Sequence, residues 1–122
     1  MKILLFVVII LIMSCRPNAN NANTRATTIA INTHGEELYK TQCANCHKLN
    51  ESYIGPSLKG ATTRWPSNTL LYDFVRNSQE VIARNDYAKK IFMQYKQSPM
   101  LPFPHLSDND IEQILQYCDS AK

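Results

Sequence analysis

The sequence has little excess of charge of either sign. Its 122 residues include 13 Lys and Arg and 10 Asp and Glu, which gives a formal net charge of +3. Proteins that bind nucleic acid usually carry a clustered and much stronger positive charge, because they must neutralise phosphate groups. The composition therefore gives no reason to expect a nucleic-acid partner.

Long apolar runs are also scarce, and the one at the start of the chain, residues 3–13, follows the positive charge of Lys2. This run is too short to cross a bilayer as a permanent helix. A positive start, a short apolar run and a cleavage site are typical of a secretory signal peptide. We therefore predict that residues 1–14 are a signal peptide and that the protein is exported.

The apolar run ends in LIMSC, with the cysteine at Cys15. This ending resembles the lipobox of bacterial lipoproteins, in which the signal is cut just before a cysteine that then carries lipid. The resemblance implies that Cys15 is lipidated and that the protein is a membrane-anchored lipoprotein facing the periplasm. The alternative is an ordinary signal peptide followed by an incidental cysteine.

The segment after Cys15 is rich in Asn, Ala and Thr and has almost no large apolar residue. It shows neither a helical nor a strand period, so we predict that residues 15–33 are a lipid-anchor cysteine and a flexible tether. The folded domain is then expected at residues 34–122. A domain this small usually needs a disulfide, metal, cofactor or partner to supplement its core.

No part of the predicted domain alternates between polar and apolar residues as a strand would. Four segments instead have apolar residues at helical spacing behind a residue that can cap a helix. The candidate caps are Thr33, Ser67, either Asn85 or Asp86, and Ser107. The sequence therefore predicts an all-α fold.

The stretch YKTQCANCHKLN contains Cys43, Cys46 and His47. Residues at i and i+3 share a helix face, so the two thiols can reach the same planar group. C-x-x-C-H is the attachment signature of c-type haem, in which each thiol forms a thioether and the imidazole binds the iron. We therefore predict one covalently bound haem c.

Three other interpretations of this motif are weaker. A thioredoxin-type redox pair is expected beside a βαβ pattern, which the sequence lacks. A zinc site needs further ligands at suitable spacing, whereas Cys118, His34 and His105 are isolated. A structural disulfide between the two cysteines would give His47 no role. Cys118 is expected to be a small buried apolar residue.

The motif and its surroundings resemble the class I monohaem cytochromes c over about residues 35–119. In that family the first and last helices cross, with a glycine and an aromatic residue on one and an apolar and an aromatic residue on the other. Gly35 and Tyr39 match the first pair, and Ile114 and Tyr117 match the second. The resemblance implies a small fold of about four to five helices wrapped around one covalently attached haem.

The loop IGPSL follows the motif and matches a Gly-Pro-x-Leu loop of the family. There, the proline carbonyl accepts the ring N–H of the proximal histidine and the leucine packs on the haem, which implies these roles for Pro56 and Leu58. Pro56 as a simple turn residue is the alternative. Arg64 and Trp65 are candidate donors to a haem propionate, and an exposed arginine with a packed tryptophan is the equally supported alternative.

The sixth ligand of the iron has four candidates, which are Met93, Met100, His105 and His34. Met93 lies in a helical run, where a methionine usually fills the core. Met100 lies in a segment stiffened by three prolines, SPMLPFPHLSD, which can hold a thioether in place. This segment resembles the ligand loop of the family except that Leu101 precedes the proline. We therefore predict that His47 and Met100 are the iron ligands.

The two axial positions decide the function. If both are filled, the iron changes charge with little rearrangement and no substrate binds; if one is open, O₂, peroxide, CO or NO can reach it. The sequence predicts an electron carrier rather than an enzyme, working between redox protein partners or as the subunit through which electrons enter a larger assembly. The alternative is a haem enzyme or gas sensor with a labile distal methionine.

Overall fold

The structure is a computed structural model that describes residues 33–122, and none of these residues lies in a β-strand. Residues 33–38 are α-helical and continue into a π-helix. The elements are η1 (Tyr39–Cys43), α2 (Ala61–Arg64), α3 (Asn68–Arg76), α4 (Ser78–Arg84), α5 (Asp86–Gln94) and α6 (Asp108–Ser120). The prediction of an all-α fold is confirmed.

The predicted signal peptide, Cys15 and all of the tether except Thr33 lie outside the described residues. Within residues 33–122, no helix has both the length and the apolar character needed to cross a membrane.

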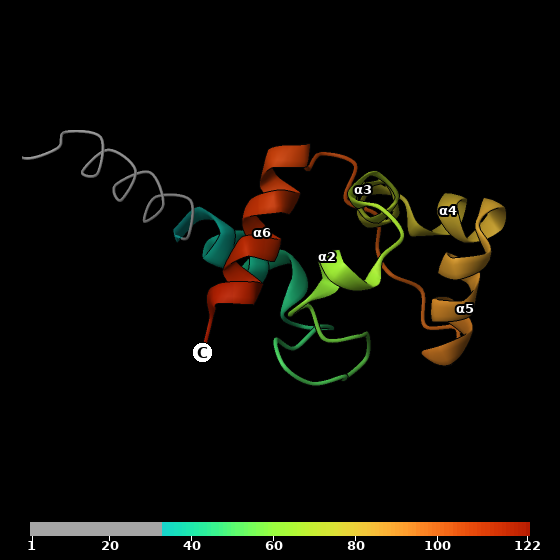
Figure 1. The fold of residues 1–122 in the computed structure, drawn as a ribbon, viewed down its shortest axis with the longest axis horizontal. Coiled ribbons are helices and arrows are strands. Elements are labelled where there is room, and N and C mark those ends of the chain that lie inside the picture. Colours follow the sequence, from blue (N-terminus) through green and yellow to red (C-terminus); the bar gives the residue numbers. More distant parts are fainter. Residues whose placement is uncertain (1–32) are drawn as a thin grey trace, which may run out of the picture.

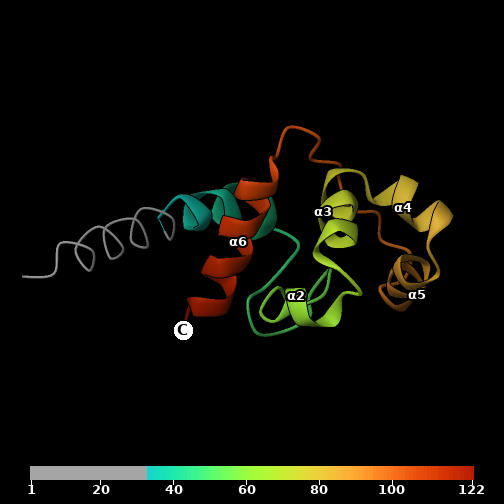
Figure 2. The same ribbon diagram turned by 45° about the horizontal axis from the view of Figure 1, so that its top comes forward.

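The helices form two groups (Figure 1). In one group, α6 contacts η1 and crosses the helical segment that leads into it. In the other, α3 packs on α4 and α4 packs on α5, while α3 also contacts α6. Figure 2 shows that the segment between α5 and α6 runs back past α3 to join the two groups. This return places residues 95–107 beside elements that lie far from them in the sequence.

Gly35 allows the first and last helices to cross at close range. A Cβ atom on this residue would lie 2.1 Å from the carbonyl oxygen of Gln113, so no other residue fits without moving the backbone. The Tyr39 and Tyr117 rings pack beside the crossing with their centroids 5.5 Å apart. The crossing inferred from the family resemblance is confirmed.

Side-chain caps start α3, α5 and α6 as predicted, whereas Thr33, the fourth predicted cap, lies within the first helix and not ahead of it. Ser67 accepts a hydrogen bond from the backbone N–H of Leu70 at the start of α3, and Asn85, rather than Asp86, caps α5. Ser107 and Asp110 form a complete capping box at the start of α6.

Helix α4 was missed by the sequence analysis. Its cap is Asn77, whose side chain accepts from the N–H of Glu80, so its start carries the same kind of signal as that of α6. The helix is only seven residues long and few of its residues are apolar, which left no clear helical period. It matters because it contacts both α3 and α5 and contributes Val81, 1 % exposed, to the interior.

The interior confirms one expectation about sulfur residues and corrects another. Cys118 is fully buried, and burial raises its pKa to about 12, so it behaves as a small neutral side chain. Met93 was expected to fill the core but is 57 % exposed. The reason is its position on the helix. Ala88, Ile91 and Phe92 lie on the inward face of α5, whereas Met93, the next residue, lies outside this face and is exposed.

The capping box of α6 gives the domain a pH-dependent contribution to stability. Hydrogen bonds from Ser107, followed by the contact with His34 at 3.1 Å, lower the pKa of Asp110 from 3.8 to about 2. Because the folded-state pKa is depressed, the carboxylate stabilises the fold above about pH 4, and this contribution is lost as the pH falls towards 2.

We expect Asp110→Asn to lower the free energy of unfolding by about 1 kcal/mol at neutral pH, because the amide keeps the shape of the cap but loses its charge. The difference from wild type should vanish near pH 2, where the wild-type carboxylate is also becoming neutral. Guanidinium unfolding at several pH values measures both. Glu112→Gln makes the same charge change on an exposed part of α6 and serves as the control; a pH-independent effect of Asp110→Asn would contradict the prediction.

Candidate functional site

The C-x-x-C-H motif lies at the end of the first helical segment. The π-helical bond from the N–H of Ala44 to the carbonyl of Tyr39 is 2.9 Å long, and the helix then ends at Cys43. The N–H groups of Cys46 and His47 both donate to the carbonyl of Cys43, at 3.1 and 2.9 Å. The sequence predicted a helix running toward Cys46. The helix instead ends at Cys43, so the second thiol lies in a turn and not on the same helix face as the first.

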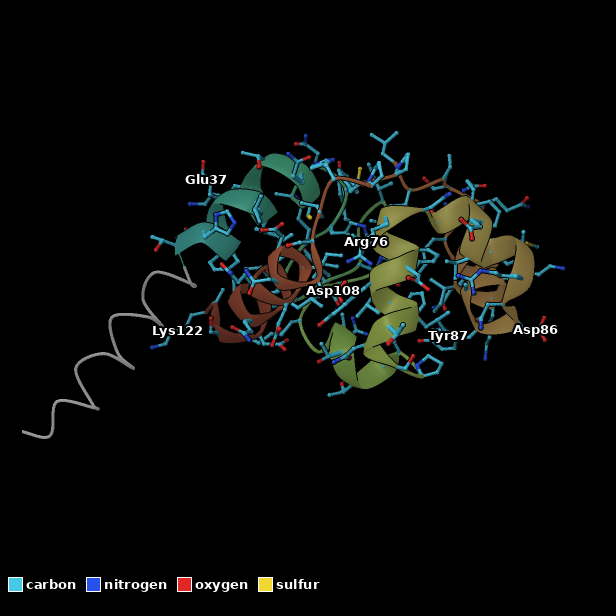
Figure 3. The ribbon with its side chains drawn as sticks, turned by 90° about the horizontal axis from the view of Figure 1, so that it is seen from above. Glu37, Arg76, Asp86, Tyr87, Asp108 and Lys122 are labelled. Carbon is cyan, nitrogen blue, oxygen red and sulfur yellow. The ribbon has the colours of Figure 1, made fainter. Side chains whose placement is uncertain are left out.

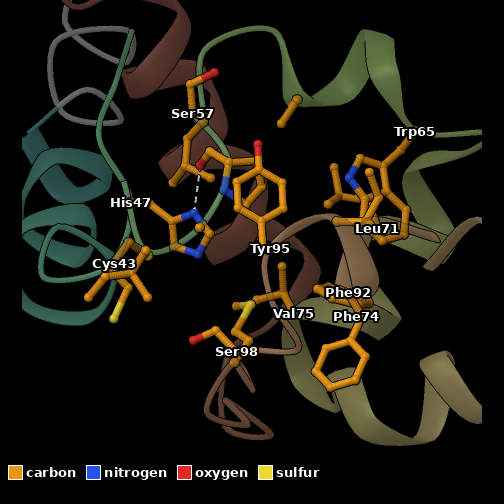
Figure 4. Close-up of a pocket in the computed structure, with 18 of the residues that line it drawn as sticks. Cys43, His47, Ser57, Trp65, Leu71, Phe74, Val75, Phe92, Tyr95 and Ser98 are labelled. Carbon is orange, nitrogen blue, oxygen red and sulfur yellow. Dashed lines mark hydrogen bonds between the residues drawn. The ribbon is translucent and has the colours of Figure 1, made fainter. Parts of the chain in front are cut away.

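His47 has a fixed orientation and tautomer. Its Nδ1 lies 2.7 Å from the carbonyl oxygen of Pro56, which can only accept, so Nδ1 carries the proton and Nε2 keeps its lone pair (Figure 4). Burial lowers the pKa of His47, while the hydrogen bond to Pro56 acts in the opposite direction. A neutral imidazole with a free Nε2 is the form that binds metals.

Gly55 makes room for this imidazole. A Cβ atom on Gly55 would lie 2.4 Å from Cε1 of His47, well inside any allowed contact. The N–H of Gly55 donates to the carbonyl of Cys46 at 2.9 Å, and the hydroxyl of Tyr39 donates to the carbonyl of His47 at 3.0 Å. The histidine is therefore held by its ring on one side and by its backbone on the other.

A cavity of about 280 Å³ opens in front of His47, and its walls are mostly aliphatic and aromatic (Figure 4). All the residues predicted for the domain's site border it: Cys43, Cys46, His47, Pro56, Leu58, Arg64, Trp65 and Met100. Residues of α3, α4, α5 and α6 complete the wall. The structure thus brings residues from both ends of the domain to one apolar space.

Arg64 and the loop after the motif are bound to each other. The guanidinium donates to the carbonyl oxygen of Lys59 at 2.6 Å and also to that of Ser57. These bonds fix the segment that carries Pro56 and Leu58. The role of Arg64 as a propionate donor stays a prediction, and its contacts in the structure give it a second role in shaping the loop.

Trp65 is packed, as one of the two interpretations expected. Its ring centroid lies 4.9 Å from that of Phe74 and 5.1 Å from that of Tyr87. Tyr87 also donates its hydroxyl proton to the carbonyl oxygen of Arg64 at 2.7 Å. The three rings form an apolar wall of the cavity, and Figure 4 shows two of them, Trp65 and Phe74.

Of the four candidates for the sixth ligand, Met100 alone borders the cavity in the described part of the chain. Met93 faces outward, His105 is exposed, and His34 contacts Asp110 at the start of α6. The carbonyl oxygen of Met100 accepts a hydrogen bond from the hydroxyl of Ser78 at 3.0 Å. Ser78 was not found from the sequence, because the short helix that it begins, α4, shows no clear apolar period.

The alternatives to haem gain no support from the geometry. Burial, with a smaller contribution from Cys46, raises the pKa of Cys43 to about 11, whereas reactive redox cysteines have lowered pKa values. Cys43 and Cys46 form no disulfide with each other. Within residues 33–122, no group of three or more His, Cys, Asp or Glu side chains is arranged to hold a metal ion.

The structure is a small helical domain whose apolar cavity is bordered by two thiols and by an imidazole in the form that binds metals. Comparison with known families agrees: the sequence model of the family described as Cytochrome c matches residues 33–122. The chain belongs to the cytochrome c family. This is in general a family of haem-based electron carriers, and its members bind haem c covalently. The chain contains one C-x-x-C-H motif and therefore binds one haem c.

Solved structures with the same fold include cytochrome c from Rhodothermus marinus. It is 30 % identical in sequence, with 74 % of this chain and 75 % of that chain covered and a TM-score of 0.60. An engineered form of that protein, Rma TDE, is also 30 % identical, with 74 % and 76 % covered and a TM-score of 0.59. The same engineered form bound to a carbene intermediate gives a TM-score of 0.58. None of the curated proteins compared matches the chain.

The residues around the cavity fit a covalently bound haem. Nε2 of His47 is the ring nitrogen left without a backbone partner, two thiols border the same space, and Gly55 leaves room for the imidazole. Among the described residues, Arg64 is the one charged side chain that borders the cavity. An apolar porphyrin with a metal centre is the chemistry that this donor set matches.

Substitution of Gly55 tests whether the His47 ring needs the space that this glycine leaves. In haem-loaded Gly55→Ala, the new methyl group should displace the His47 ring, lower the free energy of unfolding by about 2 to 3 kcal/mol and change the absorption spectrum of the ferric protein. Ser57→Ala is the control, because Arg64 contacts only the backbone carbonyl of Ser57. Unfolding curves and spectra that match wild type in Gly55→Ala would show that the imidazole is not held against this glycine.

Proposed function

We propose that the protein is a one-electron carrier in which thioethers to Cys43 and Cys46 hold the haem and His47 and Met100 are its axial ligands. The observation that carries this proposal is that His47 and Met100 border one cavity while the other three candidate ligands lie away from it. When bound, haem c supplies an iron that accepts and releases single electrons.

The residues around His47 favour stable binding of its imidazole to the iron. The Pro56 carbonyl holds the proton of His47 at Nδ1, so Nε2 stays available and its basicity is raised. On the distal side, a soft thioether from Met100 would favour the ferrous state and make the reduction potential more positive than with two imidazoles. With both positions filled, no site remains for a substrate.

The wall of the cavity and the exposed residues at its edge suit the exchange of electrons with a redox protein partner. Trp65, Phe74 and Tyr87 screen the inner part of the cavity from water. Cys46, Ile54 and Leu101 border the same cavity and are exposed, with Leu101 at 73 %. A partner docking here would approach the cofactor without the chain having to open.

The proposal includes attachment of the carrier to a membrane. The LIMSC sequence supports lipidation at Cys15, and the Asn-, Ala- and Thr-rich segment that follows supports a tether between the lipid and the domain. A tethered carrier facing the periplasm would sample partners at the membrane surface. It would work as a shuttle or as the subunit that passes electrons into a larger oxidoreductase.

Carbon monoxide separates a carrier from a gas-binding protein. The ferrous wild-type protein, produced with its haem attached, should show a c-type spectrum that does not change when CO is added, because Met100 occupies the distal position. Met100→Ala should bind CO and shift its spectrum, whereas Met93→Ala, an exposed methionine, should behave as wild type. Rapid CO binding by the wild type would instead favour the alternative of a haem enzyme or sensor.

Lipidation is tested by metabolic labelling. Cells that express the full chain and grow on a labelled fatty acid should incorporate the label into the wild-type protein and into Cys118→Ala. Cys15→Ala should incorporate none, because the acyl chains are attached at this cysteine. Equal labelling of Cys15→Ala and wild type, or an unlabelled wild type, would contradict the anchor.

A further inference from the structure

The loop that carries Met100 is fastened to the junction between α3 and α4. The hydroxyl of Ser78 donates to the carbonyl of Met100 at 3.0 Å. The N–H of Phe103 donates to the carbonyl of Arg76 at 3.1 Å, and Nε of Arg76 donates to the carbonyl of Leu106 at 2.9 Å. The short stretch from Arg76 to Ser78 therefore holds the loop at its start, at Met100, in its middle, at Phe103, and at its end, at Leu106.

Arg76 secures the far end of this loop a second time. Its guanidinium also donates to the carboxylate of Asp108, at the start of α6 (Figure 3). The middle and the end of the loop thus have several bonds. In the described structure, the bond from Ser78 is the only hydrogen bond to residues 99–102.

Ser78 differs from the other serines at helix starts. It is 1 % exposed and is the one buried polar side chain among the described residues. Ser67 and Ser107 use their hydroxyls to cap helices, but α4 is capped by Asn77, which accepts from the N–H of Glu80. The hydroxyl of Ser78 is therefore not needed to start its helix, and it serves Met100 instead.

We propose that Ser78 is a positioning residue that sets the strength with which Met100 occupies the sixth position of the iron. The inference rests on the proposed ligation by Met100. A methionine side chain has three rotatable bonds and holds no fixed direction by itself, so the position of its backbone decides whether the sulfur stays at the metal. Met100 is flanked by Pro99 and Leu101, and in the described structure neither of these two residues makes a hydrogen bond.

Removal of the hydroxyl makes Met100 easier to displace. A hydrogen bond to a backbone carbonyl contributes enough to shift such an equilibrium about five- to tenfold. An external ligand that competes with the thioether should bind more tightly by the same factor, because it needs to displace a weaker internal ligand. The reduction potential should fall, because the ferrous state loses part of its preference for the thioether.

The test uses the haem-loaded ferric protein and imidazole, which competes with Met100 for the iron. Absorption titrations should show imidazole binding to Ser78→Ala about five- to tenfold more tightly than to wild type, together with a lower reduction potential. Ser67→Ala is the matched control: it removes a serine cap and lowers the free energy of unfolding, but it touches no part of the Met100 loop. It should leave imidazole affinity and potential unchanged.

Met100→Ala distinguishes failure of the inference from failure of the proposed function. If Met100→Ala binds imidazole more tightly than wild type while Ser78→Ala has wild-type affinity and potential, the role of Ser78 is overturned and Met100 remains the ligand. An equal increase in Ser78→Ala and Ser67→Ala would also overturn it, because the effect would then reflect stability alone. If Met100→Ala itself changes nothing, the ligation by Met100 is wrong and the inference falls with it.

Discussion

The hydrogen bond between Nδ1 of His47 and the carbonyl of Pro56, 2.7 Å long, is the constraint around which the site is arranged. It fixes which ring nitrogen is free and in which direction the ring faces. The helix must end at Cys43 so that the chain can turn His47 toward the loop, and Gly55 must lack a side chain so that the ring fits. The wall of aromatic and aliphatic side chains then has to close around the space that Nε2 faces.

The two sides of the cavity are built in different ways. On the side of His47, the residues that orient the ring lie within one short stretch of sequence, and their hydrogen bonds join residues close to one another in the chain. On the side of Met100, the loop is fastened to the α3–α4 junction, so its geometry depends on helices packing correctly. The imidazole is thus set by local structure and the methionine by tertiary structure.

This difference also explains what could be predicted from the sequence. The C-x-x-C-H motif, the Gly-Pro-x-Leu loop and the Ser-x-x-Asp cap are local patterns; the residues of the first two border the cavity, and the third forms at the start of α6. Helix α4 was missed because it is short and shows no clear apolar period. Ser78 could not be assigned to Met100, because the bond between them joins residues that only tertiary packing brings together.

The same cavity suits electron transfer or ligand binding according to how firmly the distal side chain is held. The proximal histidine, the thiols and the apolar wall serve either use, so they do not decide between them. Under the proposed ligation by Met100, what decides is a small difference in free energy between a methionine at the iron and a methionine displaced, which is of the size that one hydrogen bond contributes. Ser78 is the one buried polar side chain among the described residues, and under that proposal its bond to Met100 bears directly on function.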